Sequence, residues 1–437
     1  MSGLPLLGLI ILAILWIIFS SSLLKMHPVW GLLGACLLVG LGSGQAMFEV
    51  LTTITAGFGR LMGSIGLIIV FGALLGVILE RTGGTIALAD GILALFGKRF
   101  PGLAMGVIGA IVSIPVFCDS AFIVLSRINR ALGQRTSIAP ATLYLSLAGG
   151  LYLTHNLVPP TPGPVAAAGN LGLDQHLGTI ILVGLIISVP VLVVAWWWSR
   201  RSGTGITLVE DEAGEAPVKQ VVTPPLLRVA PALLAPILLL ALGTLFPLPA
   251  AWRWVSVPEV ALVTGVFLAF LLLGLPYRSE WRSWTEQGIH LAGPILIITG
   301  VGGSFGAVLA NTAIVETAGN WLGGSPDQAW VLLLAAFALA ALLKTAQGSS
   351  TSALVVGSSI FAPLLVGLED LSVWQQALLV SALGAGAMVV SHANDSFFWV
   401  VSQFSGLRVA DAYRSYTLLT LWMGLAALAM VLVLFMI

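Results

Sequence analysis

The chain has 437 residues, of which 58% are hydrophobic and only 8% are charged, and its formal net charge is zero. Soluble domains carry roughly 25% charged residues, so this composition excludes a soluble protein and predicts a polytopic membrane protein. The zero net charge gives no electrostatic reason to expect nucleic-acid binding. Two cysteines, Cys36 and Cys118, lie in apolar segments and are expected to pack there, without a disulfide framework or a metal site.

Apolar runs long enough to span a lipid bilayer recur along the whole chain. A spanning helix needs about 20 predominantly apolar residues. No basic residue precedes the first run, which we therefore read as a retained span rather than a signal peptide. Continuous runs lie at 4–24, 28–44, 64–80, 176–199, 226–246, 256–276, 287–310 and 413–437. Interrupted apolar stretches lie at 100–126, 138–170, 328–367 and 374–404.

One hydrophilic stretch divides the chain into two halves of similar size. Residues 200–225 predict a cytoplasmic linker between a first transmembrane repeat, 1–199, and a second transmembrane repeat, 226–437. The halves resemble each other at three places, which indicates a duplication. The matching segments are Gly76–Leu79 with Gly306–Leu309, Cys118–Ser120 with Gln347–Ser349, and Thr154-His155 with Ser391-His392.

Basic residues predict that corresponding loops of the two halves lie on opposite sides of the membrane. Lys and Arg mark cytoplasmic loops, and in the first half they occur at 81–99 and 127–135. The counterparts at 311–328 and 356–374 carry acids but no base. This pattern is typical of inverted-topology repeats, and it places the N- and C-termini outside. The bases that fall outside and count against this arrangement are Arg60 and Arg253.

Two of the interrupted stretches are expected to form re-entrant hairpins. The first, 100–126, would have its tip at Pro115–Ser120, and the second, 328–367, would have its tip at Lys344–Ser352. Glycine and small hydroxyl residues at the second tip suit a bend that exposes N–H groups and hydroxyls.

The other two interrupted stretches, 138–170 and 374–404, are expected to cross the membrane once each as broken helices. The first would unwind at Thr154–Asn156, before a Pro-rich run, and the second at Ser391–Asp395. The predicted fold is therefore all-α, with two inverted repeats of five crossings, one hairpin and one broken helix each. Interrupted segments at matching places of two halves are a sequence pointer to the binding site of a transporter.

The hairpin tips and helix breaks supply the candidate site, because polar residues at membrane depth usually line a substrate or ion path. Helix N-termini at such breaks offer N–H groups to an anion. The candidate substrate-binding residues are His155, Asn156, Thr161, Lys344, Gly348, Ser349, Ser350, Thr351, His392, Asn394 and Asp395. The candidate proton carriers are Asp119, His155 and His392. No sequence motif indicates a cofactor or a metal ion.

Most of these residues also have a structural interpretation that the sequence leaves open. Asp119 would carry a proton because burial disfavours its charged form, or it would pair with Lys344 or cap a helix. Lys344 would bind the substrate, or only extend its ammonium to the membrane interface. His155 and His392 would titrate near neutral pH, or tie helices together by hydrogen bonds.

Three motifs give the chain a resemblance to a known family. Thr154–Pro164 resembles the pattern T-H-x-x-x-P-P-x-P-G-P, Ser391–Trp399 resembles S-H-x-N-D-x-x-F-W, and Gly348–Thr351 is similar to G-S-x-T. These are motifs of the gluconate permease family of bacterial proton symporters, within the ion transporter superfamily. Asp119 stands where some gluconate carriers have glutamate, and Lys344 where they have arginine, and either difference would shift substrate choice.

The resemblance implies proton-coupled uptake of gluconate or a related sugar acid across the bacterial inner membrane. It also implies a homodimer with a scaffold and a mobile, elevator-like transport domain. Because the family includes D-serine carriers, D-serine is an alternative substrate, and the hydroxyl-rich tips leave sodium coupling open.

Two other classes of function remain open from the sequence. One is an intramembrane enzyme that uses the two histidines or Ser304, which lies in a G-x-S-x-G pattern at 302–306. The other is a passive anion channel. The sequence has no Walker A motif, which argues against ATP hydrolysis by this chain.

Overall fold

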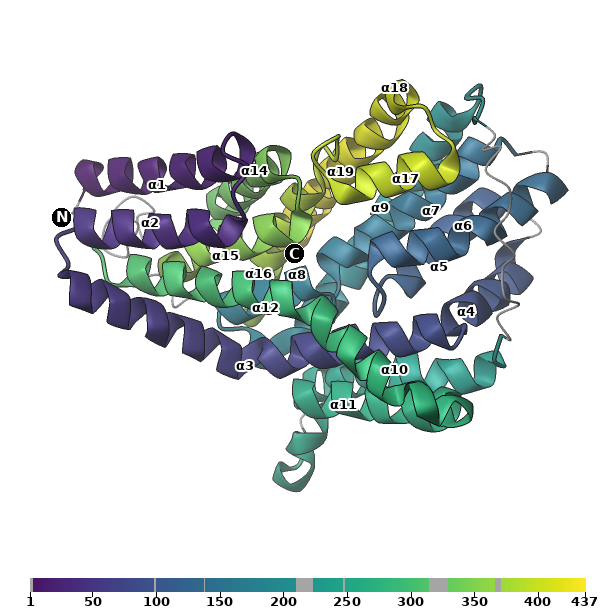
Figure 1. The fold of residues 1–437 in the computed structure, drawn as a ribbon, viewed down its shortest axis with the longest axis horizontal. Helices are drawn as coiled ribbons and strands as arrows, with labels where there is room; N and C mark the ends of the chain where they lie inside the picture. Colours follow the sequence, from purple (N-terminus) through teal and green to yellow (C-terminus); the bar gives the residue numbers. More distant parts are fainter. Residues whose placement is uncertain are drawn as a thin grey trace.

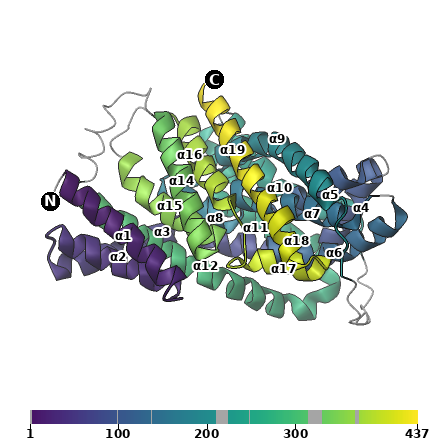
Figure 2. The same cartoon turned by 90° about the horizontal axis from the view of Figure 1, so that it is seen from above.

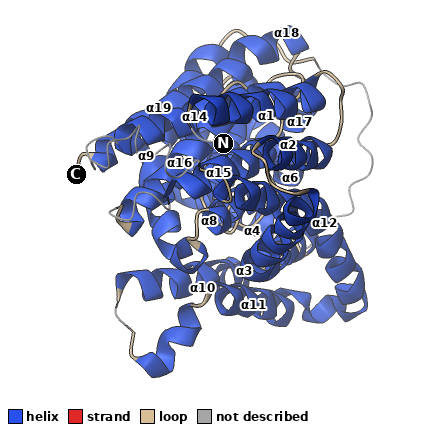
Figure 3. Cartoon of the chain, turned by 90° about the vertical axis from the view of Figure 1, so that its left-hand side faces the viewer, coloured by secondary structure: helices blue, strands red, loops and turns tan. Residues whose placement is uncertain are grey.

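Every regular element of the described chain is a helix, as Figure 3 shows. The structure, a computed structural model, describes residues 3–97, 100–136, 138–209, 223–246, 248–313, 329–365 and 371–437. Within these ranges, seven helices are long and apolar enough to cross a membrane. The prediction of an all-α polytopic membrane protein is confirmed.

The helices of the two halves follow one another in a similar order (Figure 1). The first half contains α1 Leu4–Ser22, α2 Pro28–Gly42, α3 Met47–Arg81, α4 Gly84–Ile92, α5 Pro101–Val112, α6 Cys118–Arg135, α7 Pro140–Leu157, α8 Pro162–Asn170 and α9 Leu177–Gly203. The second half contains α10 Leu226–Leu245, α11 Pro258–Ala269, α12 Trp281–Ala310, α14 Ala329–Gln347, α15 Ser350–Leu365, α16 Val373–Met388, α17 Ser396–Ser405, α18 Val409–Ala412 and α19 Leu418–Phe435.

Proline sets the starting point of many of these helices. Helices α1, α2, α5, α7, α8 and α11 each carry a proline in their first two positions. The fixed φ of proline suits the first helical turn, where its missing N–H costs no hydrogen bond. The expected span 64–80 is part of a longer helix, because α3 starts at Met47 and has 35 residues.

Helices α3 and α12 pack side by side along much of their length (Figure 1). Glycines on both helices allow this approach. A Cβ atom on Gly57 would lie 2.8 Å from the carbonyl oxygen of Gly303, and one on Gly303 would lie 3.0 Å from that of Gly57. Without side chains at these positions the two backbones come together, as small residues commonly permit in membranes.

Both predicted hairpins are present as helical pairs with short turns. Helices α5 and α6 are joined by residues 113–117, and α14 and α15 by Gly348-Ser349. Helices α14, α15 and α16 lie together in Figure 2 and contact one another. The first turn lies slightly earlier than predicted, because Cys118–Ser120 already belong to the first turn of α6.

Both broken helices are also present, but the first break differs from the prediction. Helix α7 continues through His155 to Leu157, and the unwound residues are 158–161. The physical reason is that the chain stays helical until Pro159 and Pro160, which cannot donate backbone hydrogen bonds. The second break, between α16 and α17, covers residues 389–395 and includes His392 as predicted.

Equivalent helices of the two halves make equivalent contacts. Helix α5 packs on α7 and α14 packs on α16, while α7 packs on α9 and α16 packs on α19. The second arm of each hairpin packs on a helix of the other half, because α6 packs on α17 and α15 packs on α8. This reciprocity supports duplication. The repeat bounds 1–199 and 226–437, the linker 200–225 and the inverted membrane orientation remain proposals.

Several loops used for the orientation argument lie outside the described residues. They are 98–99, 210–222, 314–328 and 366–370. The orientation is therefore best tested by labelling described positions.

Single cysteines at Gly133 and Ser372 are expected to react with a membrane-impermeant thiol reagent from opposite faces. The reason is that Gly133 belongs to the base-rich end of α6, whereas Ser372 follows the acidic loop of the second half. Accessibility would be compared between intact cells and inverted vesicles, in a background lacking Cys36 and Cys118. Labelling of both positions from one face would contradict the inversion.

Candidate functional site

Four chain segments that are far apart in the sequence converge on one cavity of ≈ 330 Å³. They are the start of α6, the end of α7, the second hairpin turn with the start of α15, and the second break with the start of α17. This volume falls in the usual range of small-molecule sites, about 300–1,000 Å³. The lining residues are Phe117, Cys118, Asp119, Tyr152, His155, Gln347, Gly348, Ser349, Ser350, Thr351, Asn394, Asp395, Ser396 and Phe397.

The structure brings most of the predicted site residues to this cavity. Those that line it are Asp119, His155, Gly348, Ser349, Ser350, Thr351, Asn394 and Asp395. The predicted residues that do not line it are Asn156, Thr161, Lys344 and His392. Two of these hold nearby backbone in place, because Asn156 donates to the Tyr152 carbonyl at 2.7 Å and Thr161 donates to the Val158 carbonyl.

Lys344 forms a buried ion pair with Asp395. Its Nζ lies 2.6 Å from Oδ2 of the carboxylate, and the two side chains are 0% and 7% exposed. The same Nζ donates to the Gly348 carbonyl at 2.6 Å and stands 5.7 Å from the centre of the Tyr152 ring. Asp119, the partner considered for Lys344 from the sequence, is therefore not the acid with which Lys344 pairs.

The Asp395 carboxylate also organises the second break. Its Oδ1 accepts the N–H of Phe397 at 3.1 Å and so caps α17, and its Oδ2 accepts the Ser391 hydroxyl. The Tyr152 hydroxyl lies 3.5 Å from the same Oδ2, and the Tyr152 ring stacks on Phe397 with centroids 5.6 Å apart. Buried charges require such partners, because an unpaired charge is costly in an apolar environment.

The second hairpin turn is tied to the second break by further contacts. The Thr345 carbonyl accepts the amide of Asn394 at 2.7 Å and lies 3.0 Å from Nε2 of His392. Gly348 has a φ of +81°, and a Cβ atom there would overlap the Asn394 carbonyl. Only glycine satisfies both the left-handed backbone and this close approach.

Asp119 differs from Asp395 because it has no ion pair among the described residues. It lies in the first turn of α6, where the helix dipole favours a negative charge. Its Oδ2 lies 3.9 Å from the Cys118 thiol, and its Oδ1 has no hydrogen-bond partner. The cavity therefore contains one carboxylate whose charge no nearby base neutralises.

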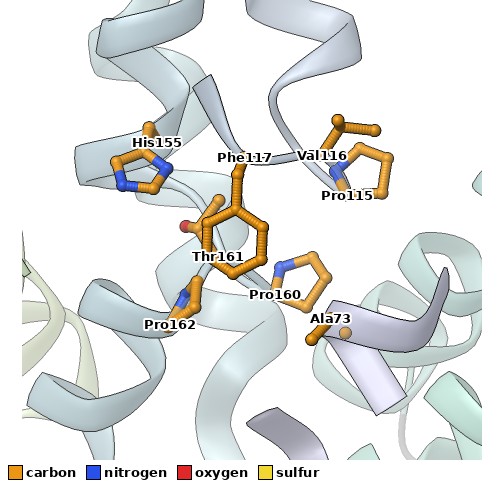
Figure 4. Close-up of a pocket in the computed structure, with 9 residues that line it drawn as sticks. Ala73, Pro115, Val116, Phe117, His155, Pro160, Thr161 and Pro162 are labelled. Atoms are coloured by element: carbon orange, nitrogen blue, oxygen red, sulfur yellow. The ribbon is translucent and has the colours of Figure 1, made fainter. Parts of the chain in front are cut away.

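His155 lies between this cavity and a second, much smaller one. The smaller cavity measures ≈ 10 Å³, about the space for one water molecule, and Phe117 and His155 line both cavities. Figure 4 shows the Phe117 ring among His155, Thr161 and Pro160. His155 as a whole residue is 7% exposed, and its Nδ1 has no hydrogen-bond partner.

The comparison with known families covers nearly the whole chain. The family model described as GntP family permease matches residues 4–437. The chain belongs to the GntP permease family. The match confirms the family resemblance found in the motifs. This GntP permease is thus a multi-pass membrane transporter and not an enzyme.

Curated relatives of this GntP permease match it almost end to end. The protein named Inner membrane permease YgbN from Escherichia coli is 31% identical, with 97% of each chain covered. A Gluconate permease from Pseudomonas aeruginosa is 28% identical, with 97% of this chain and 96% of the relative covered. The YdaH transporter of Alcanivorax borkumensis shares the fold, with a TM-score of 0.66 at 17% identity over 93% of this chain and 98% of that one.

The G-x-S-x-G pattern of this GntP permease is part of a continuous helix. Ser304 lies within α12 and its hydroxyl donates to the Ile54 carbonyl at 2.8 Å. A nucleophile elbow instead requires a sharp turn between a strand and a helix. The enzyme alternative is therefore wrong for Ser304, in agreement with the family.

Several cavity residues of this GntP permease were not among the sequence candidates. Tyr152 is the clearest case, and its signal was helical spacing, since it precedes His155 by three residues and therefore shares its helix face. Gln347 and Ser396 directly flank predicted residues. The signal for Phe117 was weak, because an aromatic residue in an apolar stretch usually packs in the core.

Proposed function

We propose that this permease is a proton-coupled symporter for gluconate or a related hydroxy-carboxylate. The observation that carries the proposal is the unpaired Asp119 carboxylate opposite a hydroxyl-rich hairpin turn. Because Lys344 neutralises Asp395, an ionised Asp119 gives the cavity surroundings a net negative charge. Protonation of Asp119 removes the repulsion that an anionic substrate would meet.

Proton and substrate would consequently bind with positive coupling. A bound proton raises the affinity for the anion, and by thermodynamic reciprocity a bound anion raises the affinity for the proton. The family and the relatives named gluconate permease, at 26–28% identity, support a sugar acid as substrate. A sodium ion at Asp119 and a D-serine substrate are the alternatives within transporters.

The second hairpin turn is the proposed carboxylate site. Ser350 and Thr351 line the cavity at the start of α15. The first N–H groups of a helix have no partners within the helix, and the helix dipole favours an anion there. Hydroxyl and N–H donors around a carboxylate form charge-assisted hydrogen bonds. The substrate hydroxyls would lie toward Asn394 and Ser396 on the other side.

Transport by purified protein in liposomes tests the function as a whole. An imposed pH gradient, acid outside, is expected to drive accumulation of labelled gluconate without sodium. A passive channel would give flux but no accumulation that depends on the proton gradient. Uptake that requires sodium would overturn proton coupling. A panel of gluconate, glycerate, fructuronate and D-serine would then define the substrate.

Ser350→Ala is expected to raise the substrate concentration for half-maximal uptake by about 10- to 150-fold. The estimate follows from the loss of one charge-assisted hydrogen bond, worth roughly 1.5–3 kcal/mol, with about 1.4 kcal/mol per factor of ten. Thr351→Val should act similarly. Uptake kinetics would be measured at equal protein abundance.

The matched control is Ser359→Ala on the same helix. The Ser359 hydroxyl is buried and donates to the Val356 carbonyl, but it does not line the cavity. This variant should keep near-normal affinity. An uncharged amide analogue should bind the wild type poorly, and equal binding of the acid and the amide would rule out an anion site at this turn.

We also place the permease in the bacterial inner membrane, as a homodimer with both termini outside and a mobile transport domain. The bacterial relatives and the name of the YgbN permease support the membrane, and the family resemblance supports the dimer and the elevator-like motion. Cross-linking of purified protein in lipid nanodiscs would test the dimer directly.

A further inference from the structure

The amide of Gln347 is a polar group that the binding scheme above leaves unused. Gln347 is the last residue of α14, directly before the second hairpin turn, and it belongs to the cavity lining. Its Oε1 and its Nε2 are both buried, and neither has a hydrogen-bond partner. Buried polar atoms are nearly always hydrogen-bonded, so an amide with two unpaired atoms at a cavity is a candidate ligand-binding group.

The side chains of Lys344 and Ser349, which are close to Gln347 in the chain, already have hydrogen-bond partners. Lys344 is occupied by Asp395 and by the Gly348 carbonyl. The Ser349 hydroxyl accepts the N–H of Ser352 at 3.2 Å, which caps the start of α15. None of these groups hydrogen-bonds to the amide, so the two N–H donors and the carbonyl oxygen of Gln347 stay free.

The two hairpin turns differ at this position. Gln347 is the last residue of α14, the first arm of its hairpin, and the residue that ends the corresponding arm of the first hairpin, α5, is Val112. The side chain of valine has no hydrogen-bonding group, whereas a primary amide has strong donors and a strong acceptor. The second turn consequently offers a hydrogen-bonding group that the first turn lacks at the equivalent place.

We propose that Gln347 recognises the hydroxyl group next to the substrate carboxylate, so that the permease selects 2-hydroxy acids. The inference rests on the proposed function. A hydroxyl group both donates and accepts, which matches the two free atoms of the amide. Gln347 and Ser350 flank the same two-residue turn and both line the cavity, so the partner of Gln347 on the substrate would lie close to the carboxylate.

The test compares gluconate with 2-deoxygluconate as inhibitors of labelled gluconate uptake. Wild-type protein should prefer gluconate by about tenfold or more, as expected for one buried hydrogen bond. Gln347→Met removes both polar atoms at similar length, and it should reduce this preference to about threefold or less by weakening gluconate alone. Because the result is a ratio within one variant, differences in protein abundance cancel.

Gln403→Met is the matched control, because Gln403 is exposed on α17 and does not line the cavity. The inference would be overturned if Gln347→Met kept the wild-type preference for gluconate over 2-deoxygluconate. If both inhibitors were weakened equally, the preference would be unchanged and Gln347 would have a positioning role. Gln347→Ala provides the same comparison should the Met variant not accumulate. Absence of gluconate uptake by the wild type would instead overturn the proposed function itself.

Discussion

Asp119→Asn is expected to abolish proton-driven accumulation of substrate while exchange of internal for external substrate survives. Asparagine resembles the protonated acid in shape and charge, but it neither releases nor accepts a proton. A site that is permanently neutral still binds the anion and moves it, although it no longer couples the movement to the proton gradient. Loss of coupling should be complete, so that labelled substrate equilibrates but does not accumulate.

The pH dependence gives a second measurement of the same variant. Substrate binding to the wild type should weaken as pH rises, because the Asp119 carboxylate then becomes negative. Binding of substrate to Asp119→Asn should not change over the pH interval in which binding to the wild type weakens. Asp174→Asn, at a partly exposed acid before α9, is the control and should behave as the wild type. Accumulation by Asp119→Asn would shift the role of proton carrier to His155 or His392.

Lys344→Met is expected to destabilise the protein by about 3–5 kcal/mol, because it leaves the buried Asp395 carboxylate without its partner. The total stability of a protein is only about 5–15 kcal/mol, so this variant should unfold at a much lower temperature or fail to accumulate. Thermal unfolding in detergent, followed by the loss of the monodisperse peak in size-exclusion chromatography, measures the effect.

A double variant distinguishes destabilisation caused by loss of the charge pair from destabilisation caused by altered packing. Lys344→Met with Asp395→Asn removes both charges, keeps a side chain of similar size in each place, and should recover much of the stability. Arg282→Met is the control, because Arg282 and Glu286 form an ion pair with side chains 91% and 64% exposed. Such exposed pairs contribute about 0–1 kcal/mol. Equal destabilisation in the single and double variants would contradict a role for the charge pair.

The interruptions of the helices could be predicted from the sequence because local residue types determine them. Pro159 and Pro160 end α7, and Gly348 occupies a backbone conformation that other residues rarely adopt. The sequence-based prediction that the helix unwinds at His155 is wrong. A polar residue in an apolar run indicates a functional role, but it does not by itself interrupt a helix.

The side-chain pairing of the site could not be predicted in the same way. From the sequence, Asp119 was the acid considered as the partner of Lys344, whereas the structure pairs Lys344 with Asp395. Which of them it meets depends on how the end of α14 docks against the start of α17, a contact between residues 51 positions apart. Helical periodicity and local propensity carry no information on such long-range docking, so the geometry of the cavity became visible only in three dimensions.

The contacts between the second hairpin turn and the second break limit how this family can be recombined. The Thr345 carbonyl accepts a hydrogen bond from Asn394 of the other segment, and the Asn394 carbonyl leaves no room for a side chain at Gly348. A chimera that imports the turn alone from a relative would pair it with a foreign docking surface. Residues 344–351 and 391–397 therefore form one structural unit. Substrate specificity should transfer between relatives only when both segments are exchanged together.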